Sequence, residues 1–188
     1  DPFKIPDHWF VINAMDFGWE HPQAHVQLIE DRESGTFYVT QAWKESHVAP
    51  EVAWATVKPW SIGVPTSWPL DGLQTEKNGT ANQQKDYYID AGFDMLHKHA
   101  SWPDGTNGVE AGLYEIRDLM IKGRFKVDRN LRDFFNEFNQ YHRNQNGKIS
   151  KTMDDLLDAI RYAYMMRRYS IPWGERSRLT SPGVISSF

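Results

Sequence analysis

The stretch VINAMDFGW, at residues 11–19, is apolar at nearly every position over the length of one β-strand. A continuous apolar run of this length predicts a strand that is buried on both faces of a sheet. Its one charged residue is Asp16. Burying a carboxylate costs free energy unless a cation or hydrogen-bond donors compensate it, and the neighbouring side chains of Met15 and Phe17 offer neither. Either a nearby arginine neutralises Asp16, or Asp16 binds a cation.

Two half-buried strands are predicted directly after this run. The segments AHVQLIEDR, at residues 24–32, and TFYVTQAWK, at residues 36–44, both alternate apolar and polar side chains. Turn-forming residues lie between them at residues 33–35. Alternation with a period of two is typical of strands, so we expect all three segments to pair in antiparallel order.

The rest of the chain carries helical patterns with short strand patterns between them. Helices are predicted at residues 51–60, 83–100, 108–123, 131–142 and 151–168, and short strands at residues 65–73 and 124–128. This order predicts an α/β fold, with a mixed sheet whose first three strands are antiparallel and with helices on both faces. We assign residues 1–169 to one domain and residues 170–188, rich in Ser, Pro and Gly, to a flexible C-terminal tail.

Composition excludes several classes of protein. The chain has 188 residues, no cysteine and a formal net charge of −4, which argues against a disulfide framework, a thiolate zinc site and a protein that coats nucleic acid by charge alone. No apolar run approaches the roughly 20 residues that span a bilayer, and the first residues lack the basic and apolar regions of a signal peptide. We expect an intracellular protein that is not secreted and has no membrane partner. The start, which lacks an initiator Met, suggests a fragment of a longer chain.

The last predicted helix, at residues 151–168, begins with a cluster of acids. Asp154, Asp155 and Asp158 lie opposite its apolar face on a helical wheel. Acids in a first turn are favoured by the helix dipole, so a solvated helix start is the simplest explanation. As metal ligands we rank Asp155 first and Asp154 second, because they border the apolar face. We expect Asp158 to lie in an outer shell or to pair with Arg161.

A further acid, Asp71, ends a short strand pattern immediately before a glycine. Its simplest role is that of an Asp-Gly turn residue. However, the ends of two strands and the start of a later helix can lie at one rim of a sheet, which would bring Asp16, Asp71 and the helix acids together. Carboxylates gathered in this way repel one another unless a hard cation such as Mg²⁺ or Mn²⁺ binds between them. Two such ions would suit phosphodiester hydrolysis.

Three short motifs carry a resemblance to a known family. AMDFGW at residues 14–19, WPLDGL at residues 68–73 and MDDLLDAIRYA at residues 153–163 occur in this order. The set resembles the nuclease domain of the large terminase subunit of tailed double-stranded DNA bacteriophages, which has a ribonuclease H-like fold. The similarity covers roughly residues 11–168.

The resemblance implies an endonuclease that cuts concatemeric viral DNA with little sequence specificity, using two Mg²⁺ or Mn²⁺ ions. It implies Asp16, Asp71 and the pair Asp154 and Asp155 as catalytic residues, with Asp16, Asp71 and Asp155 as the metal ligands. The implied partners are double-stranded DNA, an ATPase motor in the same full-length chain, the small terminase subunit and the portal protein, in the cytoplasm of the infected bacterium. This chain has no GxxxxGK[ST] motif, so we expect the motor to lie outside it.

Several basic residues are candidates for contacts with DNA phosphates. Lys148 and Lys151 lie in a polar connection just before the acidic helix, and Arg161 lies within that helix. A solvated loop and a favourable helix dipole are the simpler explanations. We expect His21 and His25 to be exposed turn residues.

Two other functions remain open from the sequence. The chain could be a different ribonuclease H-like nuclease, such as a junction resolvase or an integrase-like enzyme. It could also be a non-catalytic docking module of a packaging motor, with structural acids.

Overall fold

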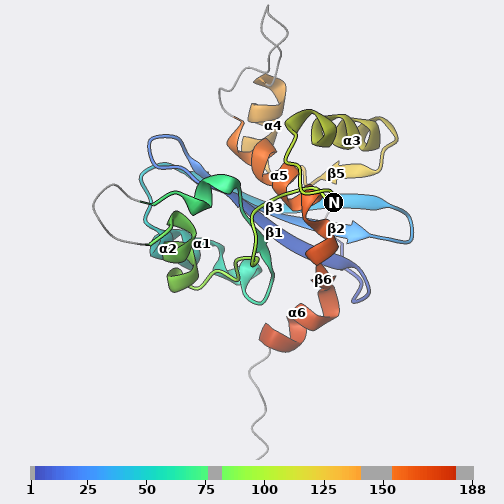
Figure 1. The fold of residues 1–188 in the computed structure, drawn as a ribbon. Coiled ribbons are helices and arrows are strands. Elements are labelled where there is room, and N and C mark those ends of the chain that lie inside the picture. The colour runs from blue at the N-terminus through green and yellow to red at the C-terminus, as the bar shows by residue number, and fades with distance from the viewer. Residues whose placement is uncertain (1–2, 76–81, 141–153, 181–188) are drawn as a thin grey trace, which may run out of the picture.

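The computed structural model describes residues 3–75, 82–140 and 154–180. It consists of one mixed sheet with helices on both faces (Figure 1). The strands are β1 (Phe10–Asp16), β2 (Gln23–Asp31), β3 (Thr36–Glu45), β4 (Thr66–Ser67), β5 (Phe125–Val127) and β6 (Ile171–Pro172). The helices are α1 (Pro50–Ser61), α2 (Gln84–Ala91), α3 (Val109–Ile121), α4 (Arg132–Gln140), α5 (Asp155–Met165) and α6 (Trp173–Thr180), with short 3₁₀ turns η1 (Leu70–Leu73) and η2 (Arg167–Tyr169).

The sheet has the strand order β4-β1-β2-β3-β5, and β6 pairs with β1 beside this path. Strands β1, β2 and β3 are antiparallel, whereas β4 runs parallel to β1 and β5 runs parallel to β3. The predicted α/β fold, with a mixed sheet and an antiparallel start, is therefore confirmed. Because β4 is parallel to β1, the chain leaves both strands at the same end of the sheet.

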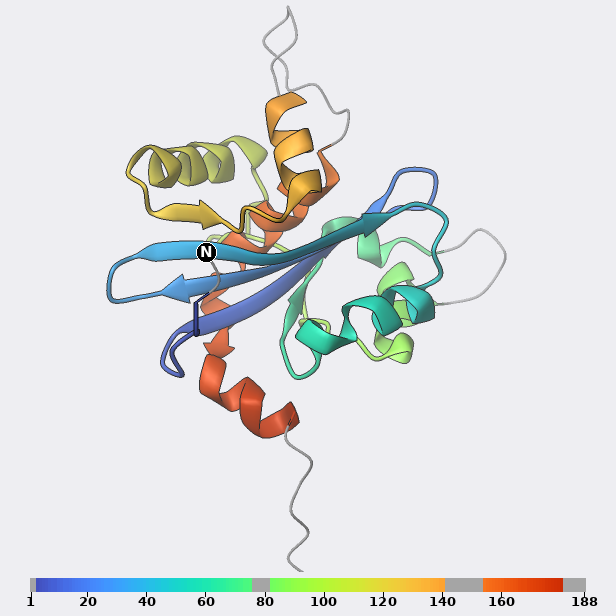
Figure 2. The ribbon, with the colours of Figure 1, turned by 180° about the vertical axis from the view of Figure 1, so that it is seen from behind.

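Strand β1 is buried on both faces, as its apolar run predicts. Ile12 and Ala14 belong to the main core, which α5 covers, whereas Met15 packs in a second cluster with α1 and α2. Figures 1 and 2, which view the molecule from opposite sides, show α5 on one face of the sheet and α1 on the other. Helices on both faces leave no solvated side for the middle of this strand.

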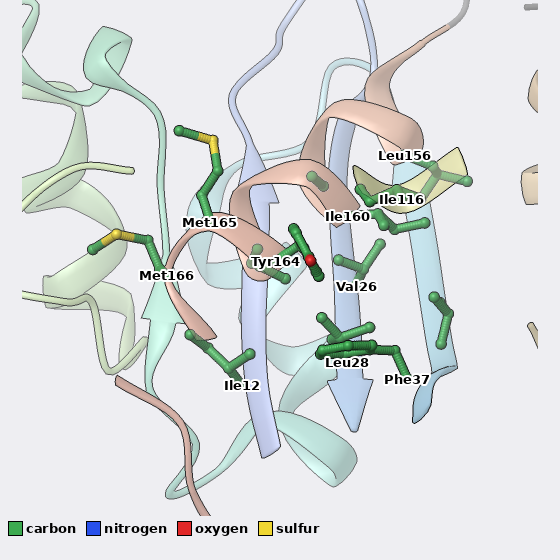
Figure 3. Packing of buried hydrophobic residues seen from close by; sticks show 14 of the residues in the cluster. Ile12, Val26, Leu28, Phe37, Ile116, Leu156, Ile160, Tyr164, Met165 and Met166 are labelled. Carbon is green, nitrogen blue, oxygen red and sulfur yellow. The ribbon is translucent and has the colours of Figure 1, made fainter. Parts of the chain in front are cut away.

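Helix α5 forms the main core with the sheet. Its residues Leu156, Ile160 and Tyr164 lie over Val26 and Leu28 of β2 (Figure 3). This spacing repeats every four residues, so one face of α5 is held against the sheet. The acids at the start of α5 are thereby fixed relative to β1.

A polar network lies beneath α1 on the opposite face. Asn13 Nδ2 donates to Ser61 Oγ at 2.9 Å, and Gln27 Nε2 donates to Asn13 Oδ1 at 3.2 Å and to the carbonyl oxygen of Trp60 at 2.7 Å. Buried polar groups need such partners. The network ties the C-terminal end of α1 to β1 and β2.

The structure differs from the sequence predictions at three places. The helix predicted at residues 83–100 ends at Ala91, because Gly92 follows it with a positive φ of 120°. The strand predicted at residues 65–73 is divided into β4 and η1. Within the predicted tail at residues 170–188, β6 pairs with β1 and α6 follows, while residues 181–188 lie outside the described residues.

Backbone contacts hold α6 to the start of the chain. The amide of Trp173 donates to the carbonyl oxygen of Trp9 at 2.6 Å, and that of Gly174 donates to the carbonyl oxygen of Asp7 at 2.9 Å.

No helix in the described part of the chain has the length and apolar character needed to cross a membrane.

Candidate active site

Asp16 is the last residue of β1, and it lies half-buried where the β1–β2 hairpin begins. It pairs in register with Ala24 of β2. The hairpin turns tightly at Gly18, where a Cβ atom would lie 2.4 Å from the carbonyl oxygen of His21. Only glycine fits there without moving the backbone, so the residues after Asp16 are tied to this one end of the sheet.

Asp71 reaches the same end through β4 and η1. Trp68, between these two elements, is buried, and its Nε1 donates to the carbonyl oxygen of Leu96 at 2.7 Å. Gly72 packs against the ring of Trp68, which fixes the turn that carries Asp71. The Asp71 side chain is exposed, and its Oδ1 accepts a hydrogen bond from Gln74 Nε2 at 3.2 Å.

Helix α5 contributes the remaining acids. Asp155 and Asp158 lie in its first turn, and Asp154 occupies the N-cap position, with no hydrogen bond from its side chain to the helix amides. Because α5 packs along β1 and β2, its first turn lies near the end of β1 that carries Asp16 (Figure 1).

The pKa of Asp16 responds to the charges of the other acids. Burial raises the pKa of Asp16 to about 8, and the negative charges of Asp158, Asp155 and Asp71 add to the effect, in that order, while Arg161 opposes it. These acids come from β1, η1 and α5, which are far apart in the sequence. Among the described residues, no hydrogen bond or ion pair with a side chain compensates the Asp16 carboxylate.

Asp158 pairs with Arg161, as the spacing suggests. Arg161 Nη2 donates to Asp158 Oδ1 at 2.9 Å, and Arg161 is 3% exposed. A contact between Arg161 and DNA stays a prediction, and it would require the guanidinium to leave this interior position. Lys148 and Lys151, the other expected DNA contacts, lie outside the described residues.

The structure places several residues near the acids that the sequence did not single out. Burial raises the pKa of Tyr162, and the charges of Asp16 and Asp158 add to the effect. Tyr162 follows Asp158 by four residues on α5, and this helical spacing was the signal available in the sequence. Burial also raises the pKa of Asp155, while the nearby charge of Lys44 lowers it.

The two histidines after β1 occupy different environments. His21 is exposed, as expected, and its charge lowers the pKa of Asp155. The prediction for His25 was wrong. It lies within β2 at 2% exposure, with its Nε2 atom 3.0 Å from Gln23 Oε1, and burial lowers its pKa to about 3.

The donor atoms at this end of the sheet suit a hard divalent cation. Asp16, Asp71 and Asp155 offer carboxylate oxygens, the ligands that Mg²⁺ and Mn²⁺ prefer. Within the described residues, no three His, Asp or Glu side chains are drawn tightly enough together to form a ready metal site.

Comparison with known proteins agrees with the fold and with the motifs. A family model described as the terminase RNaseH-like domain matches residues 13–167. The large terminase subunit of Salmonella phage P22 is 54% identical over 169 residues, which cover 90% of this chain and 34% of that protein. The chain thus spans about a third of the length of the curated relatives that it matches.

Solved structures give the same result. The nuclease domain of the P22 large terminase superposes with a TM-score of 0.87 at 52% identity, covering 93% of this chain and 90% of that domain. The nuclease domain of the large terminase from bacteriophage SPP1, solved with bound Mn, has a TM-score of 0.60 at 18% identity and covers 84% of this chain and 86% of that one. The second likeness supports the ribonuclease H-like fold alone.

Proposed function

This chain belongs to the family of terminase RNaseH-like domains, and from that premise we propose that it is a metal-dependent endonuclease that cuts double-stranded DNA with little sequence preference. The observation that carries the proposal is the raised pKa of Asp16, since burial and the acids Asp158, Asp155 and Asp71 act on it together. A site of this composition gains most from a bound divalent cation. The similar P22 domain is described as a nuclease.

We assign the binding of Mg²⁺ or Mn²⁺ to Asp16, Asp71 and Asp155, with Asp154 as an alternative to Asp155. The SPP1 nuclease domain, which shares the fold, was solved with bound Mn. Two such ions, when bound, would activate a water molecule and stabilise the leaving oxygen of the phosphodiester.

The chain's own residues prepare the site for this role. Burial of Asp16 at the end of β1 keeps its carboxyl in a fixed place, while the exposed Asp71 remains open to the solvent side from which DNA arrives. Arg161 holds Asp158 through its guanidinium, so Asp158 acts in the outer shell. The charge of Asp16 also acts on the pKa of Tyr162, so this phenol belongs to the surroundings of the site.

The length of the relatives supports a role for this domain within a larger protein. The P22 large subunit extends well beyond the matched region, and we propose that an ATPase motor precedes this domain in the full-length protein. The substrate would then be concatemeric viral DNA in the cytoplasm of the infected bacterium. The small terminase subunit and the portal protein would be its partners there.

The proposal is tested by incubating this chain with supercoiled plasmid in Mn²⁺, with and without EDTA. We expect cleavage only without chelator, and none by Asp16→Ala. Asp118→Asn removes an exposed acid of α3 that pairs with Lys122, so this control should cleave as the wild type does. Cleavage in EDTA, or full activity of Asp16→Ala, would overturn the proposal.

Substrate choice separates this function from that of a related nuclease. We expect linear duplex DNA to be cut at least as fast as a four-way junction of the same length. A strong preference for the junction would instead indicate a resolvase.

A further inference from the structure

A buried ion pair lies beneath the start of α5. Glu137 of α4 is fully buried, and its Oε1 atom accepts a hydrogen bond from Lys44 Nζ of β3. The Lys44 side chain is only 14% exposed. These residues are 93 positions apart in the sequence, and neither belongs to the motifs that indicate the active site.

The second oxygen of Glu137 caps α5. Glu137 Oε2 accepts hydrogen bonds from the backbone amides of Leu156 at 2.9 Å and Leu157 at 3.3 Å. The first amides of a helix have no partner within the helix, and the N-cap residue Asp154 supplies none from its side chain. The Glu137 carboxylate, on a different helix, thus caps the N-terminus of α5.

This cap is directly adjacent to the proposed ligand Asp155. Leu156 and Leu157 are the next two residues, so Glu137 fixes the backbone on which the Asp155 carboxylate is carried. Lys44 in turn holds Glu137 in place through its hydrogen bond to Oε1. Outer contacts of this kind orient metal ligands and change metal affinity.

We propose that Glu137 and Lys44 are positioning residues that set Asp155 for divalent-cation binding. The inference rests on the proposed function, because it concerns the same metal site. A purely structural pair could be replaced by apolar side chains of similar volume at little cost in stability, as is often found for buried ion pairs. A positioning pair could not be replaced in this way without loss of metal affinity.

The test is the double substitution Lys44→Met with Glu137→Met, which keeps side-chain volume and leaves no unpaired buried charge. We expect its melting temperature in EDTA to fall moderately, because the amides of Leu156 and Leu157 lose their acceptor. Its Kd for Mn²⁺, measured by titration calorimetry, should rise about 10- to 100-fold. In plasmid cleavage kcat should fall, while KM for DNA changes little.

Phe134→Leu is the matched control. Phe134 is buried in the main core on the same helix as Glu137, so its truncation should lower the melting temperature and leave the Kd for Mn²⁺ unchanged. If the double variant fails to fold, Glu137→Gln replaces it. Its amide oxygen still accepts from Leu156 but loses the charge-assisted bond to Lys44, and we expect a smaller rise in the Kd.

The outcomes separate the two proposals. A Kd for Mn²⁺ within twofold of the wild type, in the folded double variant or in Glu137→Gln if that is the variant used, would overturn the positioning role while leaving the nuclease intact. Mn²⁺ binding that survives Asp155→Asn would overturn the positioning role alone, whereas a wild-type chain that binds no Mn²⁺ would overturn both.

Discussion

Replacing Asp16 with asparagine should stabilise the metal-free protein while abolishing cleavage. The Asp16 carboxyl is buried among Asp158, Asp155 and Asp71, and its pKa rises from 3.8 to about 8. A carboxylate held in this way costs stability whenever no cation is bound. Asn has nearly the same shape and no charge, so it removes this cost.

The magnitude follows from linkage between proton binding and folding. The pKa of Asp16 is higher in the folded than in the unfolded state, so the folded chain binds the proton more tightly. The stability penalty of the charged carboxylate is therefore absent below pH 3.8 and complete above about pH 8. Between these values each pH unit costs about 1.4 kcal/mol. At pH 7 the penalty reaches about 4 kcal/mol, an upper limit for the gain from Asn because a buried amide has its own desolvation cost.

Urea denaturation in EDTA at pH 5, 6 and 7 measures this effect. We expect the stability of Asp16→Asn minus that of the wild type to grow by about 1.4 kcal/mol for each pH unit. Titration of His25 is common to both proteins and cancels in the difference. A difference that stays constant with pH, or a variant less stable than the wild type at pH 7, would refute the reasoning.

Three further predictions concern the surroundings of the site. Gly72→Ala would place a Cβ atom 2.6 Å from the buried Trp68 ring. We therefore expect the free energy of unfolding in urea to fall by about 1 to 3 kcal/mol and plasmid cleavage to slow. Gly108→Ala, with open space around it, should change neither quantity, and equal behaviour of the two variants would contradict the argument. The wild type should lose about 1.4 kcal/mol of stability per pH unit as the pH falls from 6.5 to about 3, because His25 is held neutral in the fold with a pKa of about 3. His25→Gln should not show this loss. Urea midpoints of the two proteins that fall in parallel over this range would count against the prediction. Mn²⁺ should raise the melting temperature of the wild type in a calorimeter and leave that of Asp16→Asn unchanged, and an equal rise in both would show that the ion binds elsewhere.

Local patterns were sufficient to predict most of the fold. The continuous apolar run in β1 indicated burial on both faces, and the structure divides Ile12 and Met15 between two cores, one on each face. Alternation identified β2 and β3 because each has a period of two. The pairing of Asp158 with Arg161 also followed from spacing along a single helix.

Features that depend on contacts between distant segments could not be predicted. Asp71 lies in a 3₁₀ turn, not at a strand end, because the packing of Gly72 against Trp68 decides the path of the chain there. Glu137 looks like an ordinary polar residue of α4, and only the docking of α4 on α5 buries it. His25 is buried because α1 and α2 cover that face of β2.

Crystals of this chain soaked in Mn²⁺ would test the central claim most directly, through anomalous scattering from the metal. We predict a peak between the carboxylates of Asp16, Asp71 and Asp155, with Asp158 farther away and still paired with Arg161. A peak elsewhere on the molecule, or none at a Mn²⁺ concentration that supports plasmid cleavage, would contradict the account.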